Sequence, residues 1–169
     1  MACVAVCAVA VAVCVCCVPP LYMRSVRRYE PLFREVAQAE GVNASTLLAV
    51  ANAESGFDPE AQSKAGAKGI AQLMPATAEW VAKRAGLAYD EALLYDAEYN
   101  LTVAAKYLAY LGGKFEGEWV FAAYNAGENA VRAWLAEGIS IEDIPYRETR
   151  EYVRKVTLLE KRYRRILGG

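Results

Sequence analysis

The chain has 169 residues, enough for one domain of ordinary size, and its 19 Lys and Arg nearly balance its 20 Asp and Glu. A net charge of -1 speaks against a nucleic-acid binder, because such proteins neutralise phosphates with an excess of basic side chains. The absence of histidine removes the commonest general base, the histidine-containing triads and nearly every familiar zinc site. We therefore expect neither a metal ion nor another cofactor.

The first 20 residues form an apolar leader that is unlike the rest of the chain. Residues 2–18 carry no charge, Pro19 and Pro20 follow them, and the first charged side chain is Arg24. We expect residues 1–20 to export the chain or to anchor it at the membrane, although the run lacks a basic start and is shorter than the about 20 residues of a usual span. A disordered or wrongly assigned start is the alternative. All five cysteines lie in this leader: Cys3, Cys7, Cys14, Cys16 and Cys17.

After Pro20 the hydrophobic residues recur with helical periodicity, and no stretch alternates like a strand. Pro59, Ser63, Gly66 and Gly69 indicate a loop over residues 58–69. The pattern predicts an all-α domain of six to eight helices without a second domain. The expected helices cover residues 25–39, 43–54, 75–84, 96–111, 118–124, 128–136 and 148–167.

Two of these helices have informative hydrophobic patterns. Residues 96–111 are apolar nearly all round after their start, which is typical of a buried central helix. The last helix, over residues 148–167, instead carries its apolar residues on one stripe and should pack that stripe against the core. The stripe consists of Tyr152, Val156, Leu159, Tyr163 and Ile166.

Glu54 occupies a helix position where the pattern calls for an apolar residue. It shares one face with Leu47, Val50 and Ala51, at offsets of three, four and seven residues. A carboxyl in such surroundings loses hydration, which raises its pKa and suits it to act as a general acid near neutral pH. The alternative is a structural glutamate that bonds backbone or an arginine.

Four short blocks resemble the signatures of the soluble lytic transglycosylase (SLT) domain family. They occur in the family's order, and the resemblance extends over residues 26–167. The one departure replaces the usual Leu-Met after Gly69 with Ile70-Ala71, which exchanges packing residues and leaves Gln72 in place. The blocks are Glu-Ser-Gly-Phe at 54–57, Gly-Ala-Lys-Gly-Ile-Ala-Gln-Leu-Met-Pro at 66–75, Ala-Tyr-Asn-Ala-Gly at 123–127 and Glu-Thr-Arg-Glu-Tyr-Val at 148–153.

This resemblance implies a goose-type lysozyme-like fold for residues 21–169, with a saccharide groove between helices. It implies that Glu54 is the single catalytic acid and base. The resemblance also assigns seven residues to substrate binding: Ser63, Gln72, Met74, Ala123, Tyr124, Glu148 and Tyr152.

Some residues in these blocks have simpler interpretations. On pattern alone, Met74 and Tyr124 could equally fill the core. Asn125 is expected to bond backbone within its turn, and Asp58 to organise the loop before Pro59 and not to act as a second catalytic carboxylate.

The implied activity is cleavage of the β-1,4 bond between N-acetylmuramic acid and N-acetylglucosamine in peptidoglycan, leaving 1,6-anhydromuramyl ends. The glycan strands would be the partner, the protein a monomer, and its location the cell envelope or periplasm. Two alternatives remain open: a lysozyme-type hydrolase of the same fold, and a non-catalytic wall-binding domain.

Overall fold

The computed structural model describes residues 20–168, with side chains from Arg28 onward. The predicted leader, apart from Pro20, lies outside the described residues, so its role stays a prediction. The chain divides into two compact units, Met1–Pro31 and Leu32–Gly169, and the helices that follow belong to the second unit except for the first part of α2. Among the described helices, none combines the length and hydropathy that crossing a membrane requires.

The described residues confirm the all-α fold class, with helices and two isolated β-bridges as their only regular structure. The predicted helices are all present, with bounds shifted by a few residues. A short 3-10 helix, η1, was not predicted, because five residues are too few to show a helical period. The elements are α2 (Pro20–Glu40), α3 (Ala44–Ser55), α4 (Pro75–Arg84), η1 (Glu91–Tyr95), α5 (Ala97–Gly112), α6 (Trp119–Ala126), α7 (Glu128–Ala136) and α8 (Arg147–Ile166).

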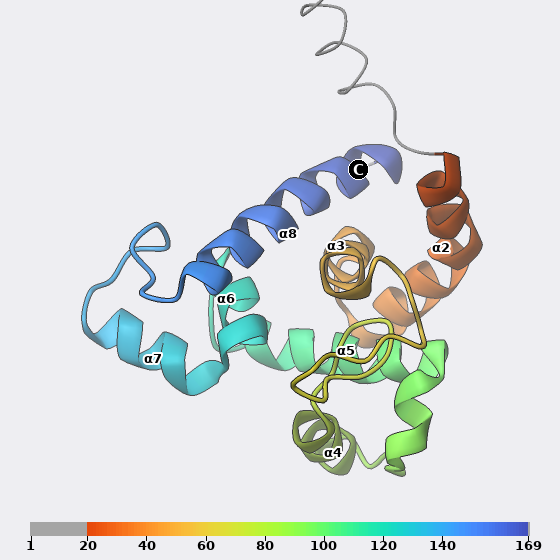
Figure 1. Cartoon of the computed structure of the whole chain (residues 1–169), viewed down its shortest axis with the longest axis horizontal. Coiled ribbons are helices and arrows are strands. Elements are labelled where there is room, and N and C mark those ends of the chain that lie inside the picture. Colours follow the sequence, from red (N-terminus) through yellow and green to blue (C-terminus); the bar gives the residue numbers. More distant parts are fainter. Residues whose placement is uncertain (1–19, 169) are drawn as a thin grey trace, which may run out of the picture. The chain divides into compact units, whose positions relative to one another are not determined.

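The predicted central helix, α5, packs against α3, α4, α6 and η1. Helix α3 lies buried between α5 and α8 in the second unit. Its residues Leu47, Leu48 and Val50 are fully buried, and it packs mainly against α8 and also against α5. Figure 1 shows α3 nearly end-on, with α8 on one side and α5 on the other. Since apolar burial is the main favourable contribution to folding, a buried helix of this kind has a fixed position. That position in turn fixes where Glu54, in its last turn, projects.

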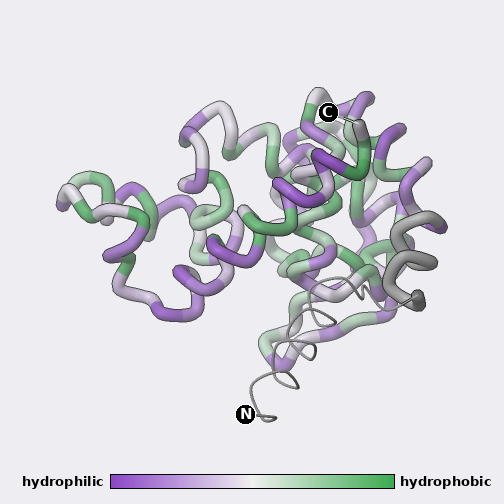
Figure 2. The backbone as a smooth tube through the Cα atoms, turned by 90° about the horizontal axis from the view of Figure 1, so that it is seen from above, coloured by the Kyte–Doolittle hydropathy of each residue, from purple (hydrophilic) through white to green (hydrophobic). Residues whose placement is uncertain are grey.

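Helix α8 is amphipathic, and its buried side is close to the predicted stripe. Tyr152, Val156 and Tyr163 are buried as expected. Ile166, however, is 42 % exposed, so its assignment to the buried stripe was wrong. The helix ends at this residue, where few neighbours remain to cover a side chain. Figure 2 shows hydrophilic and hydrophobic residues alternating along the helices, as expected for helices with one face in the core.

The chain turns sharply where α3 ends. Gly56 has a φ of 67° and closes the helix, and its N–H donates to the Asn52 carbonyl. Phe57 follows with a φ of 73°, which is unusual for a residue with a β-carbon. Burial of its ring offsets this cost, because the ring packs edge-on against Phe33 and Tyr163 at centroid distances of 5.7 and 6.3 Å. The first residues of the loop that covers Glu54 are therefore held in position by the core.

The Asn100 side chain on α5 holds the loop between α3 and α4 in place. This side chain is fully buried, accepts from the Ala71 N–H at 3.0 Å, and donates to the carbonyls of Lys68 and Leu94 at 3.0 and 2.8 Å. The close approach requires a glycine at position 69, because a β-carbon there would lie 2.0 Å from the Leu94 carbonyl oxygen. Asn100 thus ties the loop to the central helices.

Candidate active site

Glu54 opens into a cavity of about 450 Å³ that the loop, α4, α5, α6 and the start of α8 enclose. The last turn of α3 presents Glu54 there, since Gly56 ends the helix two residues later. The adjacent Ser55 fastens this turn to the loop: its hydroxyl donates to the Ile70 carbonyl at 2.7 Å and accepts from the Asp58 N–H at 3.0 Å. The carboxyl therefore has a fixed place between a helix and a tied loop.

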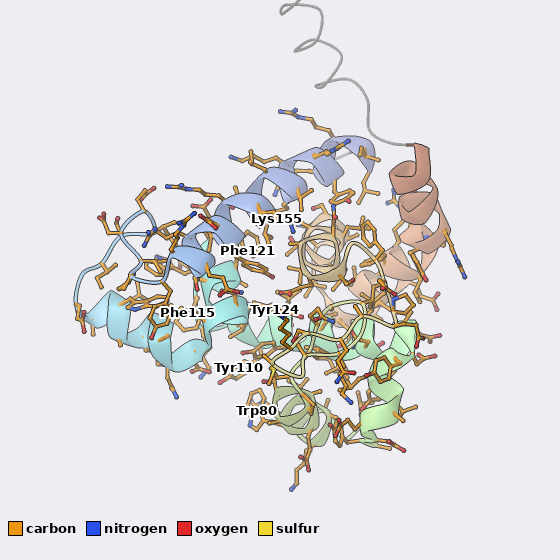
Figure 3. The ribbon with its side chains drawn as sticks, viewed as in Figure 1. Trp80, Tyr110, Phe115, Phe121, Tyr124 and Lys155 are labelled. Carbon is orange, nitrogen blue, oxygen red and sulfur yellow. The ribbon has the colours of Figure 1, made fainter. Side chains whose placement is uncertain are left out.

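Burial raises the pKa of Glu54 from 4.5 to about 7. The Tyr152 hydroxyl and the Lys155 ammonium lower this pKa, and the negative charge of Glu148 raises it, but desolvation is the largest effect. Lys155, labelled in Figure 3, is tied beside the site because its ammonium donates to the Ala53 carbonyl at 2.7 Å. At neutral pH a substantial fraction of Glu54 therefore carries a proton that it can donate.

Two tyrosines surround this carboxyl. The Tyr124 hydroxyl donates to the Ala71 carbonyl at 2.9 Å. The Tyr152 hydroxyl is buried without a hydrogen bond of regular geometry among the described residues, and its weaker interaction is with Glu54. Burial, with a smaller contribution from the charge of Glu54, raises the pKa of both tyrosines well above 10. Both rings thus stay neutral, and Tyr152 has a proton available for Glu54.

Six of the eight residues predicted for the site line the cavity. Ala123 is fully buried and Tyr152 is 9 % exposed, and neither contributes to the cavity wall. Any effect of these two on a ligand would therefore pass through neighbouring side chains. Met74 is 43 % exposed, so the core-filler interpretation does not apply to it. The six lining residues are Glu54, Ser63, Gln72, Met74, Tyr124 and Glu148.

Gln72 holds the loop as well as lining the cavity. Its backbone has a φ of 49°, and its amide nitrogen donates to the carbonyls of Ala61 and Gly69 at 3.0 and 2.9 Å. Both amide hydrogens are therefore used within the protein, and the carbonyl oxygen is the group that remains for a ligand. Ser63 accepts from the Ala67 N–H at 3.0 Å, and a serine hydroxyl in that position can still donate.

Sequence reasoning missed Thr77, Tyr107 and Gly127, which also line the cavity. Tyr107 comes from α5, and its ring lies 5.4 Å from that of Tyr124. It belongs to no recognisable motif and stands in a nearly continuous apolar run, so no signal in the sequence distinguished it from core residues. Asn125 was expected to bond backbone in its turn. Instead its side-chain oxygen accepts from the Thr149 hydroxyl at 2.8 Å, which joins α6 to α8, and the residue also lines the cavity.

Asp58 organises the loop as predicted. Its carboxylate accepts from the Glu60 N–H at 3.0 Å, within the loop, and the residue does not line the cavity. Across the described residues, no three acidic, cysteine or histidine side chains are grouped as metal ligands.

The raised pKa of Glu54 has a measurable effect on stability. A carboxyl whose pKa is higher in the folded than in the unfolded state does not change the free energy of unfolding below about pH 4.5. It lowers that free energy as the pH rises from about 4.5 to about 7, because only the unfolded state ionises in this range. We expect Glu54→Gln to unfold like the wild type at about pH 4 but to be more stable by about 2–3 kcal/mol at about pH 9. Urea unfolding at both pH values measures this difference. The exposed Glu79, changed in the same way, should show no gain, and a Glu54→Gln gain that does not depend on pH would contradict the buried carboxyl.

Comparison with known proteins identifies relatives over most of the chain. The family model described as "Transglycosylase SLT domain" matches residues 31–144. The soluble lytic murein transglycosylase of Escherichia coli (strain K12) is 34% identical over 151 residues, which is 83% of this chain and 23% of that protein. The chain thus spans about a quarter of the length of this relative.

Solved structures of lytic transglycosylases match the fold of this chain. The crystal structure of the 70 kDa soluble lytic transglycosylase SLT70 from Escherichia coli matches with a TM-score of 0.79 and 33% identity, covering 83% of this chain and 24% of that one. An inactive mutant of the lytic transglycosylase Slt from Pseudomonas aeruginosa, with a glutamate replaced by glutamine, matches with a TM-score of 0.78 and 32% identity. That match covers 82% of this chain and 24% of the other.

Proposed function

The chain belongs to the transglycosylase SLT domain family, and from this we propose that it is a lytic murein transglycosylase with Glu54 as its catalytic acid and base. The structural similarity confirms the lysozyme-like, all-α fold implied by the four sequence blocks. The observation that carries the proposed activity is the Glu54 carboxyl, which opens into a cavity and has a pKa of about 7.

In the proposed first step, protonated Glu54 donates its proton to the oxygen between N-acetylmuramic acid and N-acetylglucosamine. The C–O bond breaks, and the leaving sugar departs as an alcohol. The acetamido group of the muramic acid supports the positive charge that develops at its anomeric carbon. General-acid catalysis of this kind requires a donor that is still protonated at the working pH, which the desolvation of Glu54 provides.

In the second step, ionised Glu54 accepts the proton of the muramic acid 6-hydroxyl. That oxygen attacks the anomeric carbon, closes a 1,6-anhydro ring, and returns Glu54 to its protonated form. The substrate supplies its own nucleophile, so one carboxyl suffices where ordinary glycosidases use two. Lys155 favours the ionised form and burial favours the protonated form, so Glu54 can alternate between both at neutral pH.

The other lining residues would hold the glycan strand. Ser63 can donate a hydrogen bond and Gln72 can accept one, and the exposed side chain of Met74 offers an apolar contact. Positioning of this kind can lower a reaction barrier by several kcal/mol. Peptidoglycan strands are thus the proposed partner, and a substrate in the wall implies that the protein acts in the cell envelope or periplasm.

Mass spectrometry of digested peptidoglycan tests this function. Purified full-length protein should release fragments that end in 1,6-anhydromuramic acid. Fragments with ordinary reducing ends would identify a hydrolase, and a digest without fragments would identify a wall-binding domain. Either of these results would overturn the proposed activity.

One observation favours hydrolysis as the second candidate. Glu148 lines the same cavity as Glu54, and its charge acts on the Glu54 carboxyl. A second carboxylate could activate a water molecule, as in inverting glycosidases. Glu148→Gln should then abolish the reducing ends of a hydrolase, whereas a transglycosylase should keep forming anhydro ends.

The pH dependence of cleavage tests the chemical role of Glu54. Cleavage requires that Glu54 is protonated in the enzyme before substrate binds. We therefore expect kcat/KM to be constant in mildly acidic solution and to fall as the pH rises through about 7. Lys155→Met should shift this alkaline limb to higher pH, since the Lys155 charge lowers the Glu54 pKa. Lys161→Met, an exposed change on the same helix, should leave the limb in place. A profile that stays level to about pH 9 would exclude Glu54 as the titrating acid.

A further inference from the structure

The basic side chains of the chain are concentrated on its last helix. Helix α8 carries eight Arg and Lys but three Asp and Glu. The whole chain has 19 Arg and Lys and 20 Asp and Glu, which leaves 11 basic and 17 acidic residues outside α8. A basic helix in an otherwise acidic protein produces a local positive field that attracts anions.

Four exposed residues form a stripe along the outer side of α8. Their spacings of four, three and four residues place them on one face of the helix. Val156 and Tyr163, on the opposite face, are buried, and α8 packs against α3 and α6, which lie on one side of it in Figure 1. The stripe therefore faces away from the core. This basic stripe consists of Arg154, Leu158, Lys161 and Arg165.

The charges of the basic stripe are not neutralised within the protein. Two other exposed arginines of α8 form ion pairs on the helix, Arg147 with Glu151 at 2.7 Å and Arg164 with Glu160 at 3.3 Å. The charge of Arg154 acts on Glu151, but that carboxylate is bound by Arg147. Among the described side chains, no carboxylate lies within ion-pair distance of the three cations of the basic stripe. These cations are therefore available to an anionic partner.

An exposed leucine lies between these cations. Leu158 is 69 % exposed, more than any other large apolar side chain in the part of the chain that the structure describes. Basic side chains alone would suit any polyanion, whereas an exposed leucine gains free energy only where it leaves water. The interface of a lipid bilayer offers both environments, since anionic headgroups lie above the acyl chains.

A lipid surface also suits the size of the basic stripe better than a protein partner does. The stripe presents four side chains along one helix, whereas each partner in a standard protein interface contributes roughly 20–30 residues. A helix that lies on a bilayer needs only a row of cations and an apolar residue that reaches beneath the headgroups.

We propose that the basic stripe binds anionic phospholipid headgroups at a membrane surface, with Leu158 inserted beneath them. This contact is separate from the predicted leader and does not depend on the cleavage reaction. Helix α8 would lie parallel to the membrane, where each cation is attracted by the negative surface potential. Glu148, which lines the Glu54 cavity, lies roughly 120° around the helix from Arg154. Binding through the basic stripe thus leaves the cavity free to receive a strand of the wall.

Vesicle binding of the full-length protein tests the proposal. A triple variant with Arg154→Gln, Lys161→Gln and Arg165→Gln should bind vesicles of phosphatidylcholine and phosphatidylglycerol about 100-fold more weakly, because each cation near an anionic surface contributes about fivefold. Its binding to phosphatidylcholine alone should not change. The matched control removes the same charge from exposed lysines elsewhere and should keep most of the affinity. It combines Lys64→Gln, Lys83→Gln and Lys114→Gln.

Two results of this measurement would overturn the proposal. An equal loss of vesicle binding in both triple variants would mean that overall charge, and not the basic stripe, attracts the membrane. Unchanged vesicle binding, together with weaker binding of the stripe variant to purified peptidoglycan, would assign the stripe to an anionic polymer of the wall.

A second measurement locates the contact whatever the leader contributes. Leu158→Trp places a fluorescent side chain in the basic stripe, and Leu135→Trp places one at an exposed position of α7. Anionic vesicles with bromine-labelled acyl chains should quench the added fluorescence of Leu158→Trp and leave that of Leu135→Trp nearly unchanged, after subtraction of the wild-type signal. The leader is the same in both variants, so equal quenching would show that α8 does not face the lipid. Neither measurement involves cleavage, so failure of the proposed activity would leave the membrane contact standing.

Discussion

Glu54→Gln should lower the rate of peptidoglycan cleavage by about 100- to 10,000-fold, the usual contribution of general acid–base catalysis. Glutamine has nearly the same shape as protonated glutamic acid, so it can keep the contacts of Glu54 but cannot donate the proton. The buried site favours a neutral side chain, and the variant should therefore fold at least as well as the wild type at neutral pH. Mass spectrometry of the released fragments measures the loss.

The control for this variant is Glu79→Gln, the same substitution on the exposed surface of α4. It should cleave peptidoglycan at the wild-type rate. Thermal unfolding of both variants shows whether a loss of cleavage reflects chemistry or structure. Turnover of Glu54→Gln close to that of the wild type would mean that another group donates the proton.

Asn100→Leu should remove much of the stability of the folded protein. The leucine has a similar volume but removes the Asn100 partner of two buried backbone groups, the Ala71 N–H and the Leu94 carbonyl. The Lys68 carbonyl also loses its bond to Asn100 but keeps the Leu73 N–H. Each group that stays buried and unpaired costs about 1–3 kcal/mol, whereas a whole domain is stable by only about 5–15 kcal/mol. We expect either an unfolded protein or a midpoint of urea unfolding far below that of the wild type.

Asn43→Leu is the matched control, because Asn43 is exposed at the start of α3 and makes no side-chain capping bond. Its unfolding midpoint should stay close to that of the wild type. If both variants unfold at the same urea concentration, Asn100 does not hold the loop. If Asn100→Leu folds but loses cleavage, the loop can detach from α5 without unfolding the protein.

Much of this molecule could be predicted from local features of the sequence. Glycines and prolines mark the ends of α3 and α4, and the apolar spacing within each helix gives its buried face. The position of Glu54 on the buried face of α3 predicted a desolvated carboxyl, and the structure confirms the direction of its pKa shift. Ile166 shows the limit of the same reasoning, since a helical pattern continues past the point where neighbouring helices cover it.

The sequence by itself determined the helices, the family and the unusual place of Glu54, because these depend on residue spacing within short segments. The tertiary structure alone decided which distant segments meet: Asn100 with the loop, Asn125 with Thr149, and Tyr107 with Tyr124. It also decided that Gln72 uses both amide hydrogens to hold the loop, and that Trp80 and Tyr110 form a wall beside the Glu54 cavity. The physical reason is that periodicity specifies which face of a helix is buried, whereas hydrogen bonds and ring contacts between helices depend on how those helices pack.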